Sequence, residues 1–384
     1  MIKKSDFLLN DGIYFFNNGS FGACPRMVFR QYQNWQKKIE FQPVFFFQKK
    51  LLPELKKSRR LIGDFIHSDA DDLILIRNAT YAANTVIRSL DLQDDDEVLV
   101  TNHEYGACLN AWEFWQQERG FKLIKVRFEL PLPDGREIIK RFESFLTPKT
   151  KALFFSHISS KTAQLFPAAA ICRLARKHGL LSIVDGAHGI GQFDLKMPEI
   201  DPDFYFSNIH KWLFAPKGTA FLYTRKNCQS LVKPLITGWG WGSERELPSG
   251  SDYVDTNQFY GTADLSSFLS IPAALEFYRK NNVSELKKKC HDLAGYFLSE
   301  AHKITKMKPL YTVFPDCLQM AVIEIPKIYP ALELKKLLYD NYQIEVPVLE
   351  WEDKLLIRIS IQIYNTKEEV DYFLHVLGKL FSST

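Results

Sequence analysis

Two residues of complementary chemistry, Asp185 and Lys211, follow two successive apolar runs of the chain. Residues 181–184 predict a buried strand, and the acid comes directly after it. The lysine ends the segment F-Y-F-S-N-I-H-K, which begins as a second short strand. Strand ends are where open α/β sheets place their ligands, so we expect both side chains in one site. A carboxylate that keeps a ring nitrogen protonated and an amine that forms an imine are what pyridoxal phosphate requires of a protein.

The chain around this pair alternates short apolar strands with amphipathic helices, which predicts a mostly parallel sheet. Strands are expected at residues 73–76, 97–101, 121–128, 151–155, 181–184 and 219–223. Helices are expected at residues 25–41, 53–67, 81–90, 137–146 and 168–177, and a proline opens each of the first two. The aromatic loop at residues 236–260 is long enough to be functional and is expected to set the substrate.

From residue 284 onward the pattern changes to charged helices that alternate with shorter strands. Strands are expected at 321–325, 344–348 and 355–361, and helices at 332–341 and 367–381. We therefore predict three parts: an irregular N-terminal arm (1–24), a large α/β domain (25–265) and a small α+β C-terminal domain (266–384).

The composition is ordinary for a globular protein, with 46% hydrophobic and 24% charged residues and a net charge of +4 over 384 residues. The near balance of charge predicts neither a nucleic-acid nor a membrane partner. No apolar run approaches the roughly 20 residues that span a bilayer, and no signal peptide is evident, so we expect a cytoplasmic protein. The six cysteines have no metal-binding spacing, so reduced thiols and no metal site are expected.

Eight motifs together resemble the class V aminotransferase family of fold-type I pyridoxal-phosphate enzymes. Besides D-G-A-H and S-N-I-H-K they are N-N-G-S-F-G at Asn17, R-N-A-T at Arg77, N-H-E-Y at Asn102, S-H-I-S-S at Ser156, Y-G-T-A-D at Tyr260 and I-R-I-S-I-Q-I-Y-N-T at Ile357. They follow the family's order over nearly the whole chain and are most similar to isopenicillin N epimerase and its relatives. The resemblance implies the fold-type I transferase fold with a seven-stranded sheet, pyridoxal 5'-phosphate as cofactor, and a homodimer with shared active sites.

The resemblance also implies roles for individual residues. Lys211 would form the Schiff base, Asp185 would pair with the ring nitrogen, and His103 would stack on the ring. Further cofactor contacts are implied for Ala79, Thr80, Ser160, Ala187, His188, Asn208, His210, Gly261 and Thr262, the last two toward the phosphate of the partner subunit. Asn18 and Gly19 would line the mouth of the site. From the residues alone, Thr80 is placed as a helix N-cap, and both this residue and His103 are more often structural.

Arg358 alternates with isoleucines in a predicted strand. Such an arginine either pairs with a surface acid or binds a carboxylate, and its planar fork suits the carboxylate of an amino acid. Desulfurases of the family carry a nucleophilic cysteine shortly before this arginine. Residues 344–357 contain no cysteine, which argues against desulfurase chemistry.

We therefore predict an enzyme that acts at Cα of an amino acid or amino-acid derivative. Epimerisation is preferred because the resemblance points there, with transamination and elimination by a C–S or other β-lyase as alternatives. Two hypotheses come from other classes: a metal-dependent hydrolase built on Asp185, His103, His188 and His210, and a catalytically idle binding protein. The first leaves the lysine and the arginine without roles, and the presence of both disfavours the second.

Overall fold

The computed structural model describes residues 2–244 and 249–381, so parts of the predicted arm, aromatic loop and C-terminal domain (1, 245–248 and 382–384) lie outside it. Its centre is a seven-stranded sheet with strand order β2-β8-β7-β6-β5-β3-β4. The strands are β2 (Leu73–Ile76), β3 (Glu97–Thr101), β4 (Lys122–Val126), β5 (Thr150–Ser156), β6 (Leu181–Asp185), β7 (Phe204–Asn208) and β8 (Ala220–Thr224). Only β8 runs antiparallel to its neighbours, β2 and β7. The predicted mostly parallel α/β sheet is therefore confirmed.

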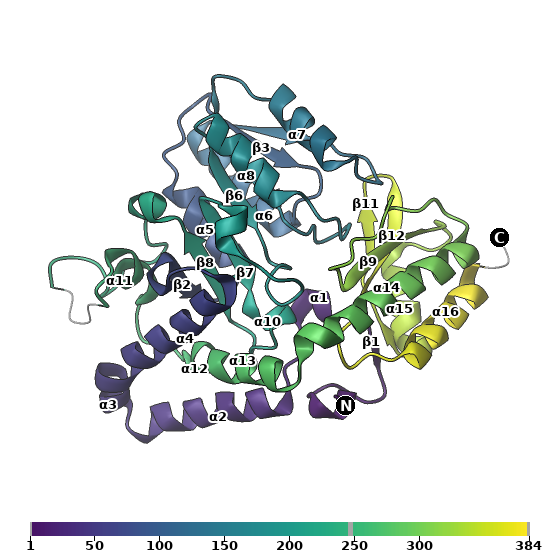
Figure 1. Cartoon of the computed structure of the whole chain (residues 1–384), viewed down its shortest axis with the longest axis horizontal. Helices are drawn as coiled ribbons and strands as arrows, with labels where there is room; N and C mark the ends of the chain where they lie inside the picture. The colour runs from purple at the N-terminus through teal and green to yellow at the C-terminus, as the bar shows by residue number, and fades with distance from the viewer. Residues whose placement is uncertain (1, 245–248, 382–384) are drawn as a thin grey trace.

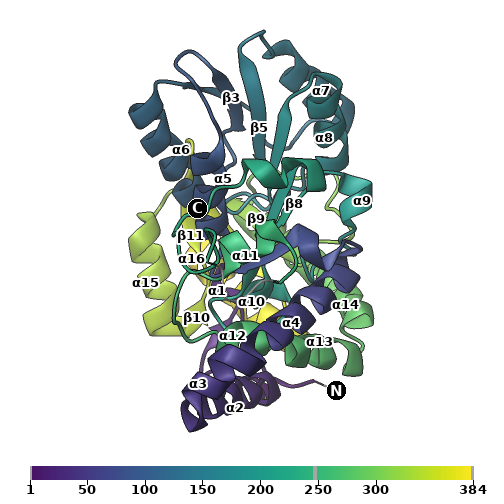
Figure 2. The same cartoon turned by 90° about the vertical axis from the view of Figure 1, so that its left-hand side faces the viewer.

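Helices cover both faces of this sheet, which is why most of its strands are apolar over most of their length. The edge strand β4, which has two lysines and is partly exposed, is the exception. On one face α5 (Ala79–Ser89) and α6 (Gly106–Arg119) share a core with Ile74 and Ile76. On the other face five helices share a core with Leu73 and Leu75. They are α4 (Leu51–Ile66), α7 (Gly135–Ser144), α8 (Ala168–Lys177), α12 (Ser266–Leu269) and α13 (Ile271–Lys280). Successive strand residues thus enter opposite cores, as the pleat requires. Figures 1 and 2 show α2 (Arg26–Phe41) and α3 (Pro43–Phe45) at the opposite end of the molecule from α7.

A second, three-stranded antiparallel sheet follows in the C-terminal part, on the right of Figure 1. It has the order β11-β12-β9 and consists of β9 (Met320–Ile325), β11 (Val348–Trp351) and β12 (Lys354–Ser360). The helices α14 (Val283–Thr305), α15 (Ala331–Tyr342) and α16 (Lys367–Phe381) pack with it around a separate core. This agrees with the predicted small α+β part.

The N-terminal arm is not irregular, because its strand β1 (Tyr14–Phe15) pairs in parallel with β10 (Ile344–Glu345). The next residues continue the contact, since the Ser360 N–H donates to the Phe16 carbonyl oxygen at 2.8 Å. The short helix α1 (Asn18–Phe21) then leads to α2. The domain limits at 24/25 and 265/266 stay a prediction, but α12 and α13 pack with α2 and α4, which favours a boundary near residue 282.

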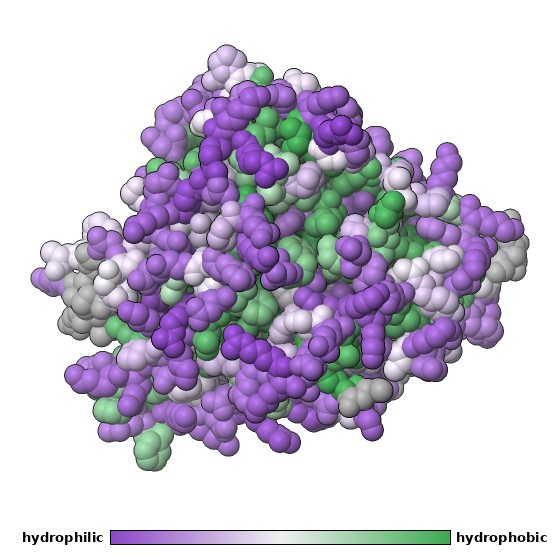
Figure 3. All heavy atoms as spheres, in the orientation of Figure 1, coloured by the Kyte–Doolittle hydropathy of each residue, from purple (hydrophilic) through white to green (hydrophobic). Residues whose placement is uncertain are grey.

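The described part of the aromatic loop contains one helix, α11 (Asp252–Gln258), which the sequence analysis missed. The Gln258 Oε1 accepts a hydrogen bond from the Leu75 N–H at 3.2 Å, so the loop is tied to the edge strand β2. Hydrophilic residues cover most of the face seen in Figure 3, with smaller apolar areas between them. Among the described helices, none has both the length and the apolar character that crossing a bilayer demands.

Candidate active site

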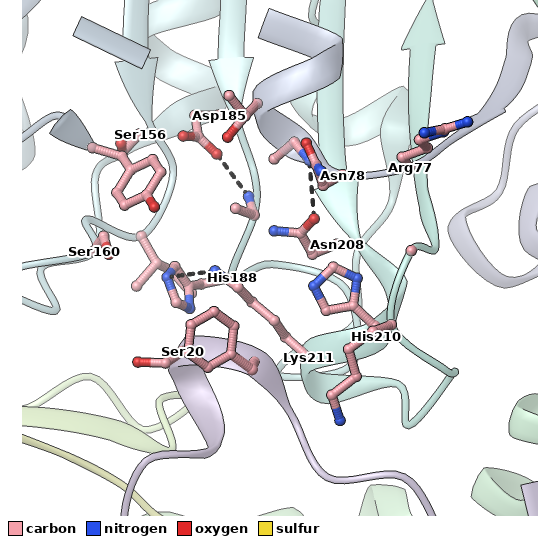
Figure 4. Close-up of a pocket in the computed structure, with 18 residues that line it drawn as sticks. Ser20, Arg77, Asn78, Ser156, Ser160, Asp185, His188, Asn208, His210 and Lys211 are labelled. Carbon is pink, nitrogen blue, oxygen red and sulfur yellow. Dashed lines mark hydrogen bonds between the residues drawn. The ribbon is translucent and has the colours of Figure 1, made fainter. Parts of the chain in front are cut away.

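A cavity of about 310 Å³ lies at the ends of β5, β6 and β7 (Figure 4). The predicted residues that line it are Ala79, Thr80, Ser160, Asp185, Ala187, His188, Asn208, His210 and Lys211. They come from four segments of the chain, and the parallel topology brings these segments together. The cavity is also lined by residues to which the sequence analysis gave no role: Ser20, Phe21, Arg77, Asn78, Tyr105, Ser156, Ile158, Lys217 and Gly218.

Lys211 lies in α10 (Ile209–Trp212), the turn after β7, and its Nζ is 3.3 Å from His188 Nε2. The Trp212 indole N–H donates to His188 Nδ1 at 3.3 Å, so the imidazole carries its proton on Nε2. Burial first, and then the nearby cations, lower the pKa of His188 well below its ordinary value. Burial likewise lowers the pKa of Lys211 to about 8. The lowered pKa makes the neutral amine accessible near pH 8, and in that form Lys211 can accept the His188 hydrogen and act as a nucleophile or base.

Asp185 ends β6 and is 2% exposed. Its Oδ1 accepts from the Ala187 N–H at 2.9 Å, and Cys108 Sγ lies 3.5 Å from its Oδ2. Burial raises the pKa of this carboxyl, while the Ala187 N–H and the Lys211 charge oppose the rise. A cation beside it would therefore be strongly favoured.

The glycines of D-G-A-H-G explain the shape of this turn. A Cβ on Gly186 would lie about 2.1 Å from the ring of Tyr205, and one on Gly189 about 2.3 Å from its hydroxyl oxygen. The Tyr205 side chain therefore fills the space beneath the turn and fixes the backbone that carries Asp185.

The N-terminus of α5 faces the cavity, but its cap differs from the prediction. Asn78, not Thr80, is the N-cap, and its Oδ1 accepts from the Tyr81 N–H at 2.8 Å. The Asn208 Oδ1 accepts from the Ala79 N–H at 3.0 Å. Within the described residues the Thr80 N–H is the amide of this turn left without a partner, and it is available for an anion.

His210 stands beside this end of the cavity, with its Nδ1 donating to the Thr219 carbonyl oxygen at 2.9 Å. Burial lowers the pKa of His210 to about 4, so near neutral pH its other nitrogen is an acceptor. His210 therefore holds a phosphate oxygen only when the anion raises its pKa enough to protonate it. Arg77 also lines the cavity and adds a fixed positive charge, and the R-N-A-T motif contained the signal for it.

The prediction that His103 stacks on the cofactor is wrong in this geometry. The His103 ring is 1% exposed, its Nε2 donates to the Phe128 carbonyl oxygen at 2.9 Å, and its Nδ1 lies 2.8 Å from Thr162 Oγ1. It packs against Trp351, outside the residues that line the cavity. Tyr105, two residues later, is 45% exposed and lines the cavity instead.

Asn18 and Gly19 do not line the cavity either. Asn18 is fully buried, donates to the Lys211 carbonyl oxygen at 3.1 Å and accepts from the Ala23 N–H at 3.1 Å. A Cβ on Gly19 would lie 2.7 Å from Ser360 Oγ. Asn18 and Gly19 therefore support the backbone of Lys211 and fix the position of α1. The following residues of α1, Ser20 and Phe21, line the cavity.

Arg358 lies in β12 and is 3% exposed. Its Nη1 donates to the carbonyl and hydroxyl oxygens of Ser160, and its Nη2 to Ser20 Oγ at 3.1 Å. No carboxylate pairs with it in the described part of the chain, so the surface ion-pair alternative is wrong there. Burial lowers the pKa of Arg358 to about 10, which leaves it charged near neutral pH. A buried cation held only by serines at the cavity wall is suited to a carboxylate.

Gly261 and Thr262 lie outside this cavity in their own chain. Their predicted contact with the phosphate of the partner subunit stays a prediction. The hydroxyl of the preceding Tyr260 accepts from Arg77 Nε at 3.3 Å, which links this segment to the cavity wall.

The metal-hydrolase alternative gains no support from the described residues. His103 lies outside the cavity with both ring nitrogens engaged, and no cluster of three or more His, Cys, Asp or Glu side chains is arranged for a metal in residues 2–244 and 249–381. The cavity instead combines a carboxylate, a half-buried primary amine and a helix N-terminus with an open amide. That donor set fits the ring nitrogen, aldehyde and phosphate of pyridoxal phosphate.

The fold and this donor set define a pyridoxal-phosphate enzyme of fold type I. The family model described as Aminotransferase class-V matches residues 13–373, and the chain belongs to this family. The cofactor is therefore pyridoxal 5'-phosphate, and the protein is an enzyme of the class.

The relatives span several reactions. Isopenicillin N epimerase of Amycolatopsis lactamdurans is 28% identical over 95% of this chain and 94% of its own length. Hercynylcysteine sulfoxide lyase of Schizosaccharomyces pombe is 26% identical over 97% and 96%. A solved structure of a C-DES mutant, with glycine covalently linked to the PLP cofactor, has a TM-score of 0.85 at 18% identity and covers 98% of this chain and 99% of that one.

Proposed function

We propose that the protein acts at Cα of an amino acid or amino-acid derivative and, like isopenicillin N epimerase, inverts that centre. The observation that carries the proposal is the half-buried Lys211 amine, which shares one cavity with the Asp185 carboxylate and the serines that hold Arg358. When bound, the cofactor supplies an electron sink for charge at Cα.

Each residue of the chain then has a defined task. Lys211 holds the cofactor and moves the Cα proton, while Asp185 holds the proton of the ring nitrogen. Arg358, with Ser20 and Ser160, orients the substrate carboxylate. Tyr105 is proposed as the acid on the second side of Cα, because it lines the cavity and is exposed enough to regain its proton from water.

Elimination at the β carbon is the second candidate function. Relatives named L-cysteine desulfhydrase and hercynylcysteine sulfoxide lyase support it at identities similar to those of the epimerases. The same lysine and carboxylate clamp serve both reactions, so the substrate's β substituent decides between them.

A panel of L- and D-amino acids in heavy water tests the function. For an epimerase we expect deuterium at Cα and loss of optical purity, without release of ammonia or a keto acid. Ammonia and keto-acid release would replace the epimerase by the lyase candidate, and conversion of the cofactor to its amine form would replace it by a transaminase. The absence of Cα exchange with every amino acid and derivative tested would contradict the proposal.

Arg358→Lys should raise KM by about 10- to 100-fold, with bound cofactor unchanged, because a point charge replaces the two-pronged donor. Steady-state kinetics and the cofactor absorbance measure the two effects. Arg127→Lys is the matched control, since Arg127 pairs with Glu352 on the surface. An unchanged KM would remove the carboxylate-binding role.

We also propose a homodimer with shared sites in the cytoplasm. The corner between α2 and α3 leaves Phe41 90% exposed and Val44 67% exposed, and exposed apolar groups of this kind suit an interface. The six cysteines are free, which suits a reducing compartment.

A further inference from the structure

A second carboxyl group, Glu104, is buried next to the Asp185 site. Glu104 is 3% exposed and lies in the turn after β3. Its Oε2 is 2.6 Å from Ser156 Oγ, and its Oε1 is hydrogen bonded to Thr101 Oγ1. Ser156 lines the cavity and is the register partner of Asp185 across β5 and β6. In the described part of the chain no lysine, arginine or histidine forms an ion pair with Glu104.

The hydrogen bonds around Glu104 fix which groups donate. Thr101 Oγ1 accepts from the His103 N–H at 3.1 Å and donates its own hydrogen to Glu104 Oε1. If Glu104 is an anion, the Ser156 hydroxyl must donate to its Oε2. If Glu104 is a neutral acid, its own O–H donates to Ser156 Oγ, and the Ser156 hydrogen is released toward the cavity.

The surroundings favour the neutral acid. Burial, with the nearby Asp185 charge adding to it, raises the pKa of Glu104 to about 8, although the two hydroxyls oppose the rise. Three other ionisable groups lie near this pair among the described residues. Cys108 contacts Asp185 through its Sγ, and the pKa of the Tyr205 hydroxyl is raised by burial and by the Asp185 charge. Lys211 is the third, and its charge acts on both Asp185 and Cys108. The one cation of the cluster therefore lies on the Asp185 side, not beside Glu104.

We propose that Glu104 is a positioning residue that holds a proton beside Asp185, so that the two carboxyl groups carry one negative charge and the Ser156 hydroxyl becomes a donor facing the cavity. Two consequences follow. The charge available to the cofactor ring is confined to Asp185, and ionisation of Glu104 in alkaline solution withdraws the Ser156 donor. The first consequence rests on the proposed function, whereas the proton on Glu104 and the loss of the Ser156 donor do not.

The proton is tested on the cofactor-free full chain by infrared spectroscopy. We expect a protonated-carboxyl band that persists at pH 7, is lost as the pH passes about 8, and is absent from Glu104→Gln. Glu129→Gln, which removes an exposed carboxyl, should keep the band. If Glu104→Gln does not fold, Ser156→Ala is used instead. In that variant Glu104 keeps its proton but loses the Ser156 acceptor, so the carboxyl band should remain and change its frequency. A wild-type protein without the band at pH 7, or a band unchanged by these variants, would overturn the proposal.

Urea unfolding gives an independent readout of the same proton. In the unfolded chain Glu104 ionises near its ordinary pKa of 4.5, whereas in the folded chain it keeps its proton to about pH 8. Unfolding between these values releases one proton, so stability falls as the pH rises and levels off above 8. The unfolding constant of the wild type should rise about tenfold per pH unit relative to that of Glu104→Gln. Parallel pH curves for the two proteins would contradict a stored proton.

The role toward the cofactor has its own measurement. The absorbance of the bound cofactor should change with pH near 8 in the wild type, and Glu104→Gln should lack this step while keeping its cofactor. If the infrared band is present but borohydride labels no lysine, the proposed function fails and the proton-holding role of Glu104 stands. If the label is found on Lys211 but the band is absent, the reverse holds.

Discussion

Lys211→Ala is expected to lose the covalent attachment of the cofactor, and its turnover is expected to fall about 10⁴-fold. The Lys211 side chain serves both as the attachment point and as the base, so the substitution removes both functions. Among residues 2–244 and 249–381 no other amine has the same environment: the Lys211 Nζ lies 3.3 Å from His188, and burial lowers its pKa to about 8. Borohydride reduction followed by peptide mapping should place the label on the Lys211 peptide of the wild type. The variant should carry no label, and its kcat measures the loss.

Two further variants separate charge from chemistry. Lys211→Arg keeps a positive charge but cannot attach the cofactor, so it should be as inactive as the alanine variant. Lys217 lines the same cavity and donates to the Gly22 carbonyl oxygen at 2.9 Å. Lys217→Ala should still be labelled on Lys211, and a label on another lysine in Lys211→Ala would contradict the assignment.

Asp185→Asn should lower kcat by about 10²- to 10³-fold while the fold and the Ala187 contact are kept. The amide oxygen can still accept from the Ala187 N–H, but the charge that stabilises a protonated ring nitrogen is lost. Steady-state kcat and the absorbance of bound cofactor check the result. Asp203→Asn is the control, because Asp203 accepts from Ser182 at the opposite end of β6 and affects stability instead. Wild-type turnover in Asp185→Asn would remove the role of this acid.

The local order of the chain predicted most of the large sheet. Short apolar runs bounded by polar residues gave β2, β3, β5, β6 and β8 within a residue or two, because strands covered on both faces have to be apolar throughout. The same reasoning placed Asp185 and Lys211 at neighbouring strand ends. Their meeting in one cavity follows from parallel pairing, which the alternation of strands and helices already implied.

The wrong residue assignments lie in turns, where a shift of one or two residues decides which side chain faces the cavity. His103 and Tyr105 both follow β3 within four residues, and the sequence does not show which of them turns toward the cavity. Asn78 and Thr80 are both good capping residues, and the structure shows that Asn78 is the cap. Asn208, which is distant in sequence, accepts from the Ala79 N–H and so helps to fix this turn. A cap or a turn is decided by such distant contacts, which leave no local pattern.

The pairing of β1 with β10 was also hidden from the sequence, because two-residue strands far apart in the chain have no periodicity. It has a consequence for biosynthesis. Ser20 and Arg358, whose side chains are hydrogen bonded to each other, are 338 positions apart, so the N-terminal segment leaves the ribosome long before its partner strands exist. The seven strands of the large sheet are complete by residue 224, whereas the carboxylate clamp is finished only when β12 emerges. A nascent or prematurely terminated chain therefore has the lysine and the acid in place but lacks Arg358, to which we assign the binding of the substrate carboxylate.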